Sequence, residues 1–219
     1  MKYINCAQGT SEWLSARSGL ITASRFCDAR AKLTKASKNG KVGDPSGAAI
    51  EYAWKTAIER IAGTPVGENF ETWQMRRGTA FEPHARLAYE SSTGNLASEA
   101  GIALTDDGVF GYSSDGLIDS DGMIEIKCPS ASQKIGTTWA NPERAADEYI
   151  DQIMGGMWIT GRKWCDLVIF CPWLEPVGKD LFVQRLERDE AFIEELEDDL
   201  LQFKLLVDQF EAKLREQAA

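Results

Sequence analysis

Histidine is nearly absent from this sequence, with His84 the only one among 219 residues. A lone imidazole cannot form a histidine-rich metal cage, and this scarcity argues against mechanisms that need a histidine general base. We therefore expect His84 to be structural. The cysteines are odd in number and form no C-x-x-C pair, which argues against a disulfide framework and against a zinc or iron–sulfur site. We expect small buried residues at all five cysteines: Cys6, Cys27, Cys128, Cys165 and Cys171.

Long apolar runs are missing as well. No stretch reaches the roughly 20 residues that a membrane-spanning helix needs, and the N-terminus has no basic region followed by a hydrophobic segment. We therefore expect a cytoplasmic protein without a targeting signal. The chain also has no internal repeat and no low-complexity segment. With 219 residues and 43% hydrophobic content, residues 1–219 are expected to form one domain with a sizeable core.

The chain has no excess of positive charge, because its formal net charge is −10. Contacts to nucleic-acid phosphates depend on Lys and Arg, so such contacts would need local concentrations of basic residues. The acidic excess is concentrated late, from Glu187 to Asp199. A basic segment lies near the N-terminus and carries Lys32, Lys35, Lys38 and Lys41. This basic segment fits either a loop that contacts the backbone of DNA or a solvated loop; an acidic exterior would then confine DNA to one basic path.

The strongest pattern lies within residues 111–129. Residues 123–128 predict a short strand, because β-branched and apolar residues alternate there with polar ones. Successive side chains of a strand point to opposite faces, so Glu125 and Lys127 share one face and Ile126 turns into the core. The predicted strand therefore presents a carboxylate and an ammonium group side by side.

A second strand is predicted just before this one, over residues 109–112, with residues 119–122 forming the turn between the two strands. Asp115 would lie just past the end of that strand, so that it converges with Glu125 and Lys127. Hard oxygen ligands of this kind suit Mg²⁺ or Mn²⁺. A lysine beside them can orient or deprotonate a metal-bound water and stabilise a phosphorane-like transition state. The same residues also fit ordinary turn and edge-strand charges.

Five motifs along the chain carry a resemblance to a known family. They are R-x-G-x-I-T-A-S-R-F (17–26), R-G-x-x-x-E (77–82), S-x-D-G-L (113–117), E-x-K-C-P (125–129) and Q-x-x-x-x-M-W-x-T-G (152–161). In these motifs and their order the chain resembles the lambda-type exonucleases, also called alkaline exonucleases or YqaJ-like viral recombinases. That family belongs to the restriction-endonuclease-like PD-(D/E)xK superfamily. The resemblance extends over about residues 13–188, most of the chain.

The resemblance implies a metal site. Asp115 and Glu125 would be the principal metal ligands, with the backbone carbonyl of Ile126 as a further oxygen ligand. Lys127 would position or activate the attacking water. In the family a glutamate matching Glu82 approaches the metal, often through water, whereas a solvated helix carboxylate is the alternative reading of this residue.

Two helices are expected to carry further site residues. Glu82 lies on a predicted helix over residues 79–90, and Gln152 lies on another over residues 145–159. In the family the glutamine matching Gln152 contacts the nucleophilic water or the scissile region. Tyr149 precedes Gln152 on the same predicted helix face and is expected to be either a neighbour in the site or a core residue.

The resemblance also implies a pocket for a 5′-terminal phosphate. Arg17, Ser24 and Ser113 would form it, since a planar guanidinium grips anionic oxygens by paired hydrogen bonds and hydroxyls complete the cradle. Ser24 also fits a helix cap, a role compatible with phosphate binding. The family places another basic residue after E-x-K-C-P. Gln133 stands at that position in this chain, which leaves Lys134 as a substitute.

The fold class that follows is α/β, with a restriction-endonuclease-like core. We expect a mixed central sheet of about five strands flanked by helices, with the N-terminal helices on one side. Further strands are predicted over residues 166–171 and 181–186, joined by a turn at 172–178. A long amphipathic helix is predicted over residues 189–217, and its apolar stripe packs either on its own domain or on another chain. Most tryptophans should be core residues, and an exposed one could wedge against a DNA base pair.

The function implied by the resemblance is Mg²⁺-dependent 5′→3′ degradation of one strand of linear duplex DNA, with Mn²⁺ as a possible substitute metal. The products would be mononucleotides and a 3′ single-stranded overhang for a phage-type single-strand annealing protein. The family assembles as a ring-shaped homotrimer, and a phage or prophage source in a bacterial host is expected. Two alternatives are a structure-specific endonuclease of the same superfamily and a DNA-binding protein that has lost catalysis.

Overall fold

The computed structural model describes residues 1–36, 40–67 and 73–216, apart from the side chains of residues 73–76 and 79. Lys38 of the predicted basic loop and residue 217 of the predicted C-terminal helix lie outside these ranges. Within them no helix is both long enough and apolar enough to cross a bilayer.

The strands form two mixed sheets of four strands each rather than the predicted five-stranded sheet. The first sheet has the order β1-β3-β4-β2, with β1 at Lys2–Ile4, β3 at Ile102–Leu104, β4 at Phe110–Tyr112 and β2 at Ile21–Thr22. The second sheet has the order β5-β6-β7-β8, with β5 at Gly116–Ile118, β6 at Gly122–Lys127, β7 at Trp164–Phe170 and β8 at Leu181–Glu187. The α/β fold class is confirmed, and the prediction of one central sheet is wrong.

The chain passes from one sheet to the other at residues 113–115, between β4 and β5. The turn predicted at residues 119–122 is present, but it joins β6 to β5 rather than to β4. Asp119 adopts a left-handed conformation in this turn, with φ of 43°. Because β5 is only three residues long, it leaves little periodicity in the sequence from which to predict it. Asp115 therefore lies at the junction of the two sheets.

Seven α-helices and three short 3₁₀ helices surround the sheets in the described residues. The α-helices are α1 (Ser11–Arg17), α2 (Phe26–Arg30), α3 (Gly47–Ala62), α4 (Trp73–Thr93), α5 (Ser132–Ala140), α6 (Ile150–Thr160) and α7 (Glu190–Arg215). The 3₁₀ helices are η1 (Ala23–Arg25), η2 (Pro142–Arg144) and η3 (Pro172–Val177). Side chains cap several N-termini: Thr10 accepts a hydrogen bond from a backbone N–H of α1, and Ser46 and Asp189 do so for α3 and α7.

Helix α6 begins five residues later than predicted, because η2 and a series of turns occupy residues 142–149. Pro142 stands in the first turn of η2, where its missing N–H is tolerated. Tyr149 is consequently the N-cap residue of α6 rather than part of its first predicted turn.

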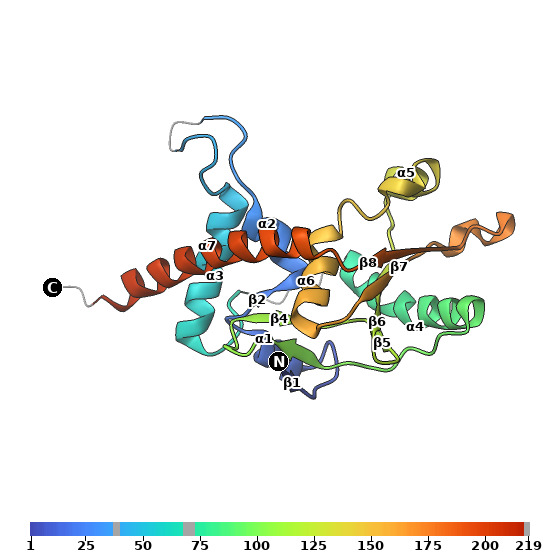
Figure 1. The fold of residues 1–219 in the computed structure, drawn as a ribbon, viewed down its shortest axis with the longest axis horizontal. Coiled ribbons are helices and arrows are strands. Elements are labelled where there is room, and N and C mark those ends of the chain that lie inside the picture. Colours follow the sequence, from blue (N-terminus) through green and yellow to red (C-terminus); the bar gives the residue numbers. More distant parts are fainter. Residues whose placement is uncertain (37–39, 68–72, 217–219) are drawn as a thin grey trace.

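Helix α7 lies along α3, as Figure 1 shows for the red and cyan helices. Phe203 stacks on Tyr52 with ring centroids 5.1 Å apart, and Phe210 stacks on Trp54 at 3.9 Å. Leu200 and Val207 on the same helix are fully buried. Aromatic pairs of this kind contribute about 0.5–1.5 kcal/mol beyond the burial of their area. The apolar stripe of α7 therefore packs mainly on its own domain.

The expectation that all five cysteines are buried is corrected. Cys27 is exposed and Cys128 is half-buried, whereas the other cysteines are buried as expected. Cys27 lies on the short helix α2, on a face that turns away from the core residues Phe26 and Ala29. His84 is exposed on α4 and tilts against Phe81.

Two adjacent glycines let α6 approach the first sheet closely. A Cβ atom on Gly155 would lie 2.4 Å from the ring of Phe26, and one on Gly156 would lie 2.6 Å from the ring of Tyr112. Such distances are far inside van der Waals contact, so larger residues would push α6 away from β4. The small residues of α6 therefore determine how near this helix comes to α2 and β4.

We predict that Gly155→Ala lowers the free energy of unfolding by about 1–3 kcal/mol, because the methyl group overpacks the Phe26 ring. Gly136→Ala on α5 is the matched control, since nothing lies within 4 Å of its added Cβ. The control should leave stability unchanged or raise it by up to about 1 kcal/mol through helix propensity. Urea unfolding curves measure both variants, and equal stabilities would contradict this packing.

Candidate active site

The candidate active site is built on β6, whose two neighbours β5 and β7 pair with it along both edges. Glu125 and Lys127 share one face of this strand, and the Lys127 Nζ donates a hydrogen bond to Glu125 Oε1 at 2.8 Å. Ile126 points to the opposite face and packs in a separate apolar cluster with Val168 and Phe170. The strand alternation predicted from the sequence is confirmed.

Glu125 is almost fully buried, with only 2% of its surface exposed. Its carboxylate accepts hydrogen bonds from three elements. Lys127 donates to Oε1 from β6, Gln152 Nε2 donates to Oε1 from α6 at 2.5 Å, and the Tyr112 hydroxyl donates to Oε2 from β4 at 2.9 Å. Lys127 also donates to Gln152 Oε1 at 3.1 Å, which closes a triangle of side chains. The structure therefore brings Glu125, Lys127 and Gln152 together as expected.

Asp115 lies beside this triangle and is also buried. Its Oδ2 accepts a hydrogen bond from the backbone N–H of Ile126 at 2.7 Å, and its carbonyl accepts one from Arg86. Burial, together with the nearby charge of Glu125, raises the pKa of Asp115 well above its ordinary value. Burial lowers the pKa of Lys127, but Glu125 and Asp115 outweigh burial and the pKa is raised overall. The site thus holds two buried carboxyl groups and one ammonium group.

Glu82 reaches the edge of the site from α4. Its carboxylate pairs with Arg86 at 3.5 Å, and burial raises its pKa. In the described part of the chain no three His, Cys, Asp or Glu side chains surround one point closely enough to hold a metal ion by themselves. Asp115 and Glu125 are therefore the two carboxylates that could ligate a metal ion directly. Glu82 lies at the edge of the site.

This donor set fits a hard divalent cation. The available ligand atoms are carboxylate oxygens, and two buried carboxylates share one ammonium group, so a cation between them would relieve their repulsion. Two carboxylates plus water and phosphate oxygens are the usual ligands of Mg²⁺. The arrangement lacks the nitrogen and sulfur ligands that zinc prefers.

A second cluster gathers the residues expected to hold a phosphate. Arg17 Nη2 donates to Ser24 Oγ at 3.1 Å, and the guanidinium lies 4.1 Å from the ring centroid of Trp13. Trp13 Nε1 in turn donates to Ser113 Oγ at 2.9 Å. Within the described ranges Arg17 forms no ion pair with a carboxylate, so its charge is available to an anion.

Ser24 lies inside η1 and does not cap a helix, because Thr22 and Arg25 are the N-cap residues of η1 and α2. Its hydroxyl accepts from Arg17 instead. The helix-capping alternative for Ser24 is therefore not realised.

Lys134 lies apart from the Arg17 cluster. Its Nζ donates to Glu148 at 2.9 Å and lies 4.7 Å from the ring centroid of Tyr149. Lys127 Nζ lies 5.1 Å from the same ring centroid, so Tyr149 is next to both lysines. Tyr149 is thus both a buried residue and a neighbour of the candidate site.

The basic segment is partly neutralised by the acidic helix α7. Lys32 pairs with Asp199 at 2.7 Å, and Arg30 pairs with the same carboxylate. Lys35 and Lys41 are exposed. The local basic charge available at this segment is therefore smaller than the sequence alone indicates.

Three residues of the two clusters escaped the sequence analysis: Trp13, Arg86 and Tyr112. Trp13 is four residues before Arg17 on a helix, a spacing that places two side chains on one face and could have indicated the pair. Arg86 has the same spacing from Glu82. Tyr112 belongs to the first sheet, whereas Glu125 belongs to the second, so no local spacing connects them.

Comparison with solved structures agrees with this architecture. The chain superposes on the alkaline exonuclease from Laribacter hongkongensis with a TM-score of 0.79 and 35% identity, over 94% of this chain and 96% of that one. The complex of that enzyme with dAMP gives a TM-score of 0.78 at the same identity and coverage. A phage-related exonuclease from Haemophilus somnus 129PT shares the fold, with a TM-score of 0.68 and 14% identity over 89% of this chain and 96% of that one.

Fold and site thus define a protein of the restriction-endonuclease-like class. The model of the YqaJ-like viral recombinase domain matches residues 12–163. The chain belongs to this family, and the resemblance drawn from its motifs is confirmed. No curated protein sequence matches the chain significantly.

We predict that Asp115→Asn stabilises the metal-free protein at neutral pH by about 0.5–2 kcal/mol, in the range typical when an unfavourable functional group is replaced. The substitution removes one of two repelling buried carboxylates, while the amide oxygen can still accept from Ile126 N–H. Thermal unfolding in EDTA measures the change. Asp121→Asn is the control, since Asp121 is paired with Lys163 away from the site. A destabilised Asp115→Asn would contradict the proposed repulsion.

Proposed function

We propose that this protein is a Mg²⁺-dependent exonuclease that digests one strand of linear duplex DNA in the 5′→3′ direction from a 5′-phosphorylated end. The observation that carries the proposal is the buried set of Glu125, Lys127 and Gln152 beside Asp115. The guanidinium of Arg17, which forms no ion pair within the described residues, supports the choice of a phosphorylated end. Membership of the viral recombinase family and the exonuclease relatives support the reaction class.

Asp115 and Glu125 would hold the metal, with the backbone carbonyl of Ile126 as a third ligand and Glu82 approaching through water. Bound Mg²⁺, or Mn²⁺ in its place, would lower the pKa of a water molecule and withdraw charge from the scissile phosphate. Tyr112 and the backbone of Ile126 fix the two carboxylates in place through the hydrogen bonds they donate. The carboxylates therefore need little rearrangement before the reaction.

Lys127 and Gln152 would position the attacking water. The raised pKa of Lys127 keeps its ammonium protonated at neutral pH, so it donates hydrogen bonds to the water and to the charge that develops on the phosphate. Gln152 offers both an amide donor and a carbonyl acceptor at the same place. Together these side chains orient one water for in-line attack.

Arg17, Ser24 and Ser113 would bind the 5′-terminal phosphate, and Lys134 would add a more distant positive charge. Trp13 supports this pocket by stacking under the guanidinium and by donating to Ser113. A phosphate bound there fixes the distance from the strand end to the scissile bond, so the products are mononucleotides. The relative from Laribacter hongkongensis has been crystallised with a mononucleotide, dAMP.

The product would be a duplex with a 3′ single-stranded overhang, which a phage-type single-strand annealing protein pairs with a complementary strand. In this proposal the protein acts as a ring-shaped homotrimer around DNA, in the cytoplasm of a bacterium that carries the encoding phage or prophage. The viral recombinase family and the phage-related exonuclease of the same fold support this setting.

The first test is digestion of linear duplex DNA labelled at either the 5′ or the 3′ end, in Mg²⁺ and in EDTA. We expect release of 5′ label only with Mg²⁺, and a loss of about 100-fold or more in Lys127→Ala, because removing one donor to developing charge has that effect in other enzymes. Lys163→Ala is the control, since Lys163 is exposed and pairs with Asp121. Cleavage of closed circular DNA would indicate an endonuclease, and metal-independent binding without cleavage a DNA-binding protein.

A second test concerns the end of the strand. We expect Arg17→Ala to reduce the preference for 5′-phosphorylated over 5′-hydroxyl duplexes by about 10- to 150-fold, the equivalent of one charged hydrogen-bonding group. Arg25→Ala is the matched control, because the neighbouring Arg25 already pairs with Asp28. Initial rates on the two kinds of end measure the preference. An unchanged preference in Arg17→Ala would rule out this cluster as the phosphate pocket.

A further inference from the structure

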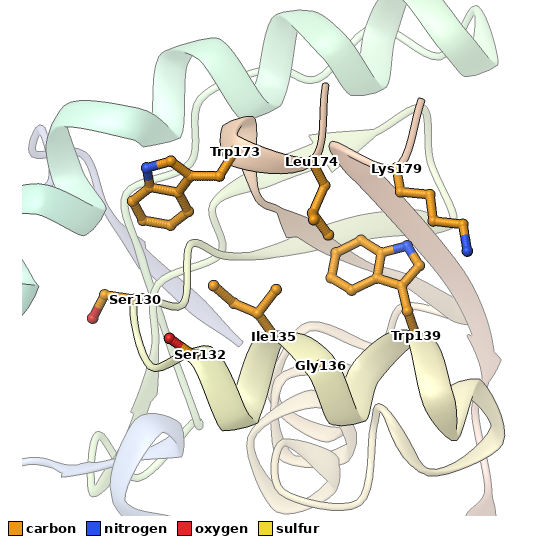
Figure 2. A pocket seen from close by; sticks show the side chains of 8 residues that line it. All are labelled: Ser130, Ser132, Ile135, Gly136, Trp139, Trp173, Leu174 and Lys179. Atoms are coloured by element: carbon orange, nitrogen blue, oxygen red, sulfur yellow. The ribbon is translucent and has the colours of Figure 1, made fainter. Parts of the chain in front are cut away.

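A groove of about 590 Å³ lies between α5 and η3, outside both clusters described above. Figure 2 shows Ser130, Ser132 and Trp173 toward one end of the groove, and Trp139 with Lys179 at the other end. Ile135 and Leu174 complete its apolar lining. The volume is in the range of sites that take small organic groups.

The groove is connected to the candidate active site by the chain itself and by the side chain of Arg77. Ser130 is three residues beyond Lys127, at the point where the chain leaves β6. Arg77 Nη1 donates to the carbonyl of Cys128 at 3.1 Å, and its guanidinium lies 4.3 Å from the ring centroid of Trp173. Trp173 is therefore connected through Arg77 to Cys128, the residue that directly follows β6. Figure 1 shows α5 and the orange η3 segment well separated from α1, so the groove is distinct from the Arg17 cluster.

The indole of Trp173 is unusually accessible. It is 55% exposed, while the other tryptophans with described side chains are buried or half-buried. Trp139, across the groove, packs edge-on against Phe182 at 6.1 Å. Two indoles beside open space offer flat apolar surfaces of the kind on which nucleobases stack. Trp173 is thus an exposed tryptophan, which the sequence could not single out.

The polar groups at the rim suit the rest of a nucleotide. Lys179 is exposed and forms no ion pair within the described residues, in contrast to Lys134, which is neutralised by Glu148. The hydroxyls of Ser130 and Ser132 can donate to a phosphate or to a base edge. Proteins that bind single-stranded DNA without sequence preference use this combination of aromatic rings and a nearby cation.

We propose that this groove binds an unpaired base of the DNA strand being digested, stacked on Trp173, with Lys179 at the other end of the groove near the adjoining phosphate. The inference rests on the proposed exonuclease function. The digested strand is the occupant because the groove adjoins the end of β6, where that strand would be held by Glu125 and Lys127. Stacking there would stabilise the separated end of the duplex beside the scissile bond.

The test uses full-length protein in EDTA, which prevents metal-dependent cleavage, and a 5′-phosphorylated duplex with two unpaired nucleotides at that end. 2-Aminopurine in the unpaired 5′ segment should lose fluorescence on binding, as this base does when it stacks on an aromatic ring. Trp173→Ala should remove the quenching and weaken binding of this substrate about 5- to 150-fold, the measured range for one base stacked on an aromatic ring. Trp173→Phe should retain most of both effects.

Leu87→Ala is the matched control, because Leu87 is an exposed apolar residue on α4 outside the groove. It should leave binding and quenching unchanged. Trp173→Ala should also unfold at the wild-type temperature, since its side chain is largely exposed. Unchanged affinity and quenching in Trp173→Ala would overturn the proposal, as would quenching confined to 2-aminopurine in the complementary strand.

Two further measurements distinguish base binding in the groove from the proposed exonuclease function and from a contact between subunits. If wild-type protein fails to digest the duplex in Mg²⁺, the proposed function fails, whereas digestion together with Trp173-independent binding overturns the groove alone. Sedimentation of Trp173→Ala tests a second copy of the chain as occupant. A loss of oligomer with unchanged binding and quenching per subunit would make the groove a subunit contact and overturn base binding.

Discussion

The site depends on one buried carboxylate, that of Glu125, and on the donors that surround it. Tyr112, Lys127 and Gln152 come from β4, β6 and α6, so a single side chain connects both sheets and a helix. A buried charge without such partners would be strongly unfavourable. The second carboxylate, Asp115, lies close by with a raised pKa. The protein thus keeps two buried carboxyl groups beside one ammonium group at this place.

Close helix packing makes this arrangement possible. Gly155 and Gly156 bring α6 against Phe26 and Tyr112, so Gln152, one turn earlier on the helix, reaches Glu125. The same approach fixes Tyr112, whose hydroxyl is the second support of that carboxylate. The stability of the α6 contact and the geometry of the site are therefore coupled: a change that moves the helix also moves the amide beside Lys127.

Many charged side chains on the surface are paired between α7 and the N-terminal half of the chain. The acidic residues of α7 pair with basic residues of the N-terminal half, as Asp199 does with Arg30 and Lys32, and Asp208 does with Arg60. These pairs reduce the basic charge on the outside of the molecule. Arg17 and Lys179 are left without such carboxylate partners in the described part of the chain. The local distribution of charge therefore differs from what the net charge of −10 alone indicates.

The sequence by itself determined the elements whose signals are local. The alternation of residues 123–128 predicts that Glu125 and Lys127 share a face, and the three-and-four spacing of the C-terminal apolar residues predicts α7. The family resemblance also predicted that Arg17, Ser24 and Ser113 form one group, and Arg17 and Trp13 connect them by hydrogen bonds and a ring contact. Only the tertiary structure decided the division into two sheets, the hydrogen bond from Tyr112 to Glu125, the separation of Lys134 from Arg17, and the exposure of Trp173. These features depend on contacts between residues far apart in the chain, which local periodicity does not encode.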